Sequence, residues 1–69
     1  MFKKFEVAFH NKEVRRLVKI GEKHKSLADD WGDTRYIEIA AQDEKDVRQK
    51  MERRYPSNLG YVIEAIKPM

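Results

Sequence analysis

Cysteine is absent from this 69-residue chain. Neither a disulfide framework nor a thiolate metal site can therefore stabilise it. A chain of this length forms one domain, residues 1–69, and a core this small cannot enclose a large active site. A small domain without disulfides is typical of a reducing compartment, so we expect a cytoplasmic location.

Long apolar runs are also missing. No segment approaches the roughly 18 consecutive apolar residues of a membrane-spanning helix, so we expect no membrane association. The first residues, Met1–Glu6, include two lysines but no apolar stretch of the kind found in signal peptides, so we expect no secretion signal there.

Net charge is low, at +3, but the charges are strongly segregated. Residues 1–25 carry a net charge of +5, residues 26–46 carry −5, and residues 47–69 carry +3. Complementary blocks of this kind can steer a charged partner, or they can pair with each other within the monomer. The chain is better described as bipolar than as mildly basic.

Three strands are predicted, the first of them from an alternating pattern of side chains. In residues 5–10 the alternation places Phe5, Val7 and Phe9 on one face. Residues 34–41 and residues 61–67 form the other two, the former with Ile37, Ile39 and Ala41 toward the core.

A helix is predicted between the last two strands, over residues 43–55. Acidic residues crowd its first turn and Arg53 and Arg54 occupy its last, which suits the helix dipole. Val47, Met51 and Tyr55 recur every fourth residue and form one apolar stripe, and proline follows directly.

The segment from residue 14 to residue 25 fits two structures. Its valine and isoleucine content favours a strand paired with the first one, with Val14, Val18 and Ile20 on one face. The alternative is a helix capped by Asn11. A long connection over residues 21–33 follows, with a short turn capped by Ser26 and ending at Gly32.

These elements predict a small two-layer α+β domain. We expect a three- to four-stranded, mainly antiparallel sheet with one main helix, in the order strand, strand, loop, strand, helix, strand. An edge strand of such a sheet can pair with a second copy of the chain, so a homodimer is one expected assembly.

Catalytic and metal-binding patterns are weak. His24 and Ser26 are close in sequence, but they do not make a nucleophile with an oriented base. The carboxylates of Asp29, Asp30 and Asp33 are more typical of a solvated acidic loop than of a cation site. We therefore expect a protein that is not an enzyme, with no catalytic residues, no metal and no cofactor.

Trp31 is the only tryptophan and lies among these carboxylates. It either packs back as a lid on the small core or anchors an interface, since tryptophan is enriched among binding hot spots. In the second case the partner-binding patch comprises Trp31, Asp29, Asp30 and Asp33, with Arg15, Arg16 and Lys19 as the opposite pole.

A nucleic-acid-binding module is the alternative. Basic side chains from the first half of the chain and from the helix could contact phosphates, and Tyr36 and Tyr61 could stack on unpaired bases. The basic set is Arg15, Arg16, Lys19, Lys23, Lys25, Arg53 and Arg54.

Residues 34–66 resemble many small phage and prophage α+β proteins. The resemblance lies in residues 36–41, 43–48, 55–56 and 60–63. The strand–helix–strand layout is also similar to that of small archaeal ribosomal proteins, without their lysine- and glycine-rich RNA-contact segments. The phage resemblance implies a stoichiometric binder or inhibitor of a host component, acting in the host cytoplasm.

Taken together, these observations favour a small non-enzymatic protein that occupies a surface of a macromolecular partner. We expect that partner to be a protein, such as a host or defence component, with nucleic acid as the alternative.

Overall fold

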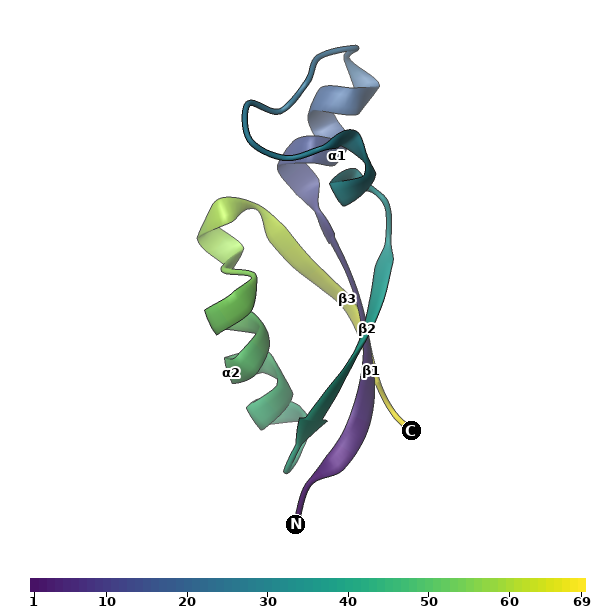
Figure 1. Ribbon diagram of the computed structural model, residues 1–69, viewed down its shortest axis with the longest axis vertical. Helices are drawn as coiled ribbons and strands as arrows, with labels where there is room; N and C mark the ends of the chain where they lie inside the picture. Colours follow the sequence, from purple (N-terminus) through teal and green to yellow (C-terminus); the bar gives the residue numbers. More distant parts are fainter.

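Three strands and two α-helices account for most of residues 1–69 in the computed structural model (Figure 1). The sheet has the order β2-β1-β3, and both outer strands run antiparallel to β1. The predicted two-layer α+β domain is thereby confirmed. The elements are β1 (Lys3–Asn11), α1 (Lys12–Lys19), β2 (Arg35–Ala41), α2 (Glu44–Arg54) and β3 (Tyr61–Pro68), with short 3-10 helices η1 (Asp29–Gly32) and η2 (Ser57–Leu59).

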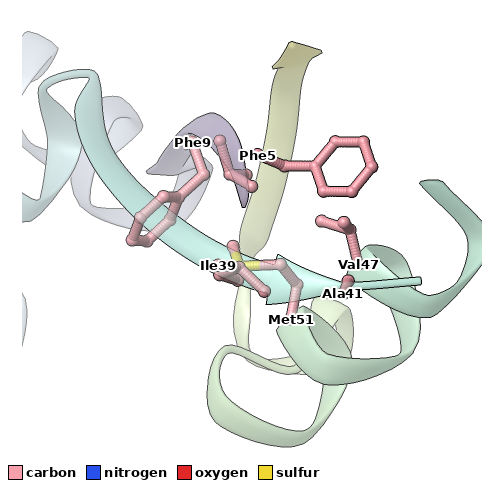
Figure 2. Packing of buried hydrophobic residues seen from close by; sticks show 7 residues of the cluster. Phe5, Phe9, Ile39, Ala41, Val47 and Met51 are labelled. Atoms are coloured by element: carbon pink, nitrogen blue, oxygen red, sulfur yellow. The ribbon is translucent and has the colours of Figure 1, made fainter. Parts of the chain in front are cut away.

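The core lies between one face of the sheet and α2, as the alternation and the helix stripe predict. Val47 and Met51 of α2 are buried against the sheet, and Tyr55 packs beside them. Figure 2 shows the side chains of both layers pointing toward one another. From the sheet the buried contributors are Phe5, Val7, Phe9, Ile39 and Ala41.

The strand expected within residues 14–25 is wrong, because this segment begins with helix α1. The Oδ1 atom of Asn11 accepts hydrogen bonds from the backbone N–H groups of Glu13 and Val14, at 3.0 and 3.1 Å. This cap starts the helix and turns Val14 into the core. Val18 and Ile20, which the strand would have buried with Val14, are exposed. The capped-helix alternative is the correct one.

The connection between α1 and β2 contains the expected short turn, which is η1 and ends at Gly32. Its N-cap residue is Ala28, and no side chain caps it, so the predicted cap by Ser26 is wrong. Ser26 instead donates its backbone N–H to Nδ1 of His24, which also accepts the N–H of Leu27. The imidazole thus organises the loop that leads into η1.

An irregularity in the pairing of β1 with β3 changes which side chains of β3 share a face. Ala8 pairs with Ala65, whereas Phe9 pairs with Ile63, so Glu64 is an extra residue on β3. A bulge of this kind shifts the alternation by one position. As a result Ile63 and Ile66, three residues apart, both pack against the core.

Asn11 also joins three elements at one end of the sheet. Its side chain is fully buried, and its amide nitrogen donates to the carbonyl oxygen of Leu59 at 3.1 Å. Lys12 donates its N–H to Gly60 O at 2.7 Å. Gly60 has a φ of 98°, and a Cβ there would lie 2.8 Å from Asn11 Oδ1, so glycine is required for this contact.

Replacing Asn11 by alanine should therefore destabilise the whole fold. We expect the free energy of unfolding to fall by roughly 2 kcal/mol, about 1 for the lost cap and about 1 for the Leu59 carbonyl left without its donor. Urea titration followed by circular dichroism measures this. Asn58→Ala, an identical change at an exposed position, is the control, and equal losses in the two variants would refute the role of Asn11.

Candidate functional site

The predicted site residues converge where η1 packs on α1. Arg15 of α1 donates from Nε to the carbonyl oxygen of Gly32 at 2.7 Å, and its Nη2 lies 3.4 Å from Thr34 Oγ1. The contact is close because Gly32 has no side chain: a Cβ there would lie 2.9 Å from Arg15 N. Arg15 thus holds the connection between α1 and β2 in place.

Trp31 packs on the core, as the lid interpretation predicts. Its ring centroid lies 6.0 Å from those of both Tyr55 and Tyr61. On its other side the Arg35 guanidinium lies 4.0 Å from the ring centroid, and Asp30 lies 3.7 Å from Arg35. Trp31 is partly buried by these contacts. Its role as an interface anchor stays a prediction.

Members of both predicted patches, the acidic one and the basic one, lie close together. The close approach of η1 to α1 places them around a single hollow of about 410 Å³. Arg16, the remaining member of the basic pole, is paired within α1 to Glu13 at 3.2 Å. The hollow is lined by Arg15, Val18, Lys19, Asp29, Gly32 and Asp33.

The basic residues of the nucleic-acid alternative are divided between two places. Arg15, Arg16 and Lys19 lie on α1 at one end of the elongated molecule, whereas Arg53 and Arg54 end α2 alongside the sheet (Figure 1). Lys23 and Lys25 belong to the loop after α1, which lies at the same end as that helix.

The two tyrosines proposed to stack on bases lie on opposite faces of the sheet. Tyr61 belongs to the aromatic cluster of the core, with its ring centroid 5.3 Å from that of Tyr55. Tyr36 pairs in register with Ala8 and faces away from α2. A single nucleic-acid strand cannot lie across both rings on one surface.

The face of the sheet away from α2 is not covered by any helix along its length (Figure 1). We call it the open face. Tyr36 lies on it near the start of the edge strand β2 and is 65% exposed. Beside it, Ala8 and Ala65 form the floor of a hollow of about 210 Å³. Side chains on the open face include those of Glu6, Ala8, Tyr36, Glu38, Ala65 and Lys67, with Lys4 and Ala40 next to Glu6 and Glu38 along the strands.

Sequence reasoning did not select the open face as a site, although the signal was present. The same alternation that turns Ile37 and Ile39 toward the core directs Tyr36 and Glu38 to the other side. A single predicted helix can cover only one face of a sheet. An exposed aromatic on the remaining face was therefore predictable.

A polar cluster borders the open face. Oε2 of Glu64 lies 2.7 Å from both Thr34 Oγ1 and His10 Nδ1, and 3.7 Å from Arg15 Nη2. The hydrogen bonds from Thr34 and then from His10 lower the pKa of the Glu64 carboxyl from its usual value of 4.5. The cluster therefore joins β1, β3, α1 and the start of β2 through a charged carboxylate.

The described side chains include no group of three or more His, Asp or Glu residues placed to hold a metal ion. The helices are too short and too polar for any of them to cross a lipid bilayer. Comparisons with protein-family models, curated proteins and solved structures gave no match to this chain. The site must therefore be interpreted from its own geometry.

Gly32→Ala should disrupt the junction of α1 and η1. The added methyl group meets the backbone of Arg15, which cannot move aside as a side chain could, so the free energy of unfolding should fall by roughly 1–3 kcal/mol. Urea titration followed by Trp31 fluorescence measures the loss. Asp33→Ala, at the next and exposed position, is the control. Equal stability of the two variants would show that the close approach is not required.

Glu64→Gln should change how stability depends on pH. A carboxyl whose pKa is lowered by folding stabilises the protein above its usual value of 4.5, and that stabilisation is lost as the pH falls through the folded-state pKa. The Gln variant should be less stable than the parent at neutral pH, and the difference should shrink in acid. Denaturant titrations across this range measure it, with Glu38→Gln as the control, and parallel curves for Glu64→Gln and the parent would contradict it.

Proposed function

We propose that the protein is a small non-enzymatic binding protein that occupies a surface of a protein partner through its open face. The observation that carries this proposal is an exposed aromatic, Tyr36, on a sheet face that no element of the chain covers. Tyrosine is enriched among residues that dominate binding energy. Ala8 and Ala65 beside it leave room for a side chain of the partner.

The charges of the open face favour a partner with basic side chains. Glu6 and Glu38 are register partners on neighbouring strands, and neither takes part in an ion pair. Like charges opposite each other destabilise a sheet. Lys67 stands opposite Glu6 on β3, whereas Glu38 takes part in no ion pair. A lysine or arginine of a partner would relieve this repulsion and could also contact the ring of Tyr36.

The same carboxylates argue against a nucleic-acid partner at this face, because they repel phosphates. The basic residues proposed to bind nucleic acid lie in two separate places and do not form a continuous stripe, so they give this alternative little support. Two of them, Arg15 and Arg16, are already engaged with Glu64 and Glu13. A protein partner is therefore the better supported proposal.

Inhibition by occupation is the mode of action that fits these features. An exposed sheet face with a small hollow can cover a partner's surface without performing chemistry on it. The resemblance of residues 34–66 to small phage proteins points to a host or defence component in the cytoplasm as the class of partner.

An affinity capture experiment tests the proposal. We expect the immobilised protein to retain a protein partner from a lysate of its own cells, with or without nuclease treatment. Tyr36→Ser should reduce retention by about thirtyfold, the effect of removing a hot-spot side chain worth ~2 kcal/mol.

Leu59→Ser is the matched control, because Leu59 is exposed to a similar extent, 60%, but lies on η2 outside the open face. Near-ultraviolet circular dichroism verifies that both variants fold. Loss of all retention after nuclease treatment would favour the nucleic-acid alternative. Equal retention by Tyr36→Ser and Leu59→Ser would reject the open face.

A further inference from the structure

A second surface lies between the free edge of β2 and α2. It is a groove of about 400 Å³ with β2 along one side and the C-terminal half of α2 along the other. The groove lies at the edge of the sheet and borders the open face, with which it shares Glu38. Its lining residues are Glu38, Ile39, Ala40, Lys50, Arg53 and Arg54.

The backbone of β2 is unpaired along this groove. In the pairing with β1, alternate residues of an antiparallel strand direct their N–H and C=O groups to the partner strand, and the others point outward. Lys4 of β1, and Lys12 directly after β1, bond to the β3 side, so the intervening odd-numbered residues of β1 bond to β2. The outward groups of β2 are therefore those of Tyr36, Glu38 and Ala40.

One contact confirms this orientation. The Lys50 ammonium lies 2.7 Å from the carbonyl oxygen of Ala40, at the edge of the sheet. A lysine at this place limits uncontrolled pairing of an edge strand. It satisfies a single carbonyl, so the N–H groups of the outward residues still need acceptors.

The side of the groove formed by α2 is strongly basic. Lys50 is paired with Asp46 at 3.5 Å, but Arg53 and Arg54 take part in no ion pair and no side-chain hydrogen bond. Favourable interaction with the helix dipole explains why positive charge ends α2. It does not explain why both arginines line a groove beside a free strand edge.

We propose that an extended acidic segment of a partner protein adds to β2 as a fourth strand in this groove. A strand supplies the alternating donors and acceptors that the outward groups of β2 require. Carboxylates of the added segment would face Lys50, Arg53 and Arg54. A nucleic-acid backbone offers phosphate acceptors but no alternating donors, so it fits the arginines without fitting the strand edge.

The geometry also specifies the pattern of the added segment. Side chains of a strand alternate between the two faces of a sheet. Those on the side of α2 meet the three cations, and those on the other side lie beside Tyr36 and Glu38. The segment should therefore carry an acidic residue at every second position, with neutral or basic residues between.

A synthetic octapeptide of alternating Glu and Thr tests the inference with the full chain. Fluorescence anisotropy should detect binding of this peptide and not of the corresponding Lys–Thr peptide. Hydrogen exchange should show slower exchange of the Glu38 and Ala40 amides in the complex, which only strand addition explains. A peptide of the same composition with its glutamates in one block should bind more weakly.

Arg53→Glu combined with Arg54→Glu should weaken binding by about tenfold. The matched control is Lys45→Glu with Arg48→Glu, the same change of charge at exposed positions of α2 outside the groove. If the first double variant unfolds, Arg53→Gln with Arg54→Gln replaces it, with a smaller loss expected.

Three results would overturn the inference. The first is equal binding of the alternating and block peptides. The second is that the peptide leaves the exchange of the Glu38 and Ala40 amides unchanged, while a single-stranded oligonucleotide binds and loses its binding when Arg53 and Arg54 are replaced. The third is self-association of the chain through β2 that the acidic peptide does not displace. None of these depends on the open face, so this inference and the proposed function can fail separately.

Discussion

The position of everything beyond the sheet depends on the buried side chain of Asn11. Its side-chain oxygen accepts the hydrogen bonds that cap the first turn of α1. Its side-chain nitrogen donates a hydrogen bond to the carbonyl oxygen of Leu59, in the turn before β3. The direction of α1 then determines where Arg15 meets Gly32, and this contact places Trp31 against the aromatic cluster. One polar residue at the end of a strand therefore connects the sheet, the first helix and the lid of the core.

This dependence explains which parts of the structure the sequence could predict. The strands and α2 follow from local periodicity, because Phe5, Val7 and Phe9 alternate and Val47, Met51 and Tyr55 recur once per turn. The segment after Asn11 did not follow its local preference, because a cap and the burial of Val14 outweigh the strand preference of valine and isoleucine. The junction of α1 and η1 could not be predicted, since it joins Arg15 to a glycine 17 residues away. The open face was predictable in principle, whereas the groove required the register of β2 and the position of α2.

Segregation of charge along the chain is not cancelled by folding. The ion pairs between Arg and Glu within α1 and α2 are local, and the long-range ones converge on Glu64. No ion pair joins residues 1–25 to residues 26–46, even where Lys19 lies across a hollow from Asp29 and Asp33. Pairing of the first basic block with the acidic block is therefore absent, and the acidic block pairs instead with the second basic block, through Glu44–Arg48 and Asp46–Lys50. The charges remain at the surface, where a partner can meet them.

The shape of the molecule leads to the same conclusion by a different argument. The radius of gyration is 13.0 Å, whereas a compact domain of this length has about 11 Å. The core lies between one face of the sheet and a single helix, so few residues are buried. The other face and the free edge of the sheet take no part in this core and can contact a partner. Both proposed surfaces share β2: its side chains present Tyr36 and Glu38 to one side, and its outward backbone groups lie beside the arginines of α2. A partner that contacts β2 at its face and its edge would provide the third layer and the fourth strand that this small domain does not build for itself.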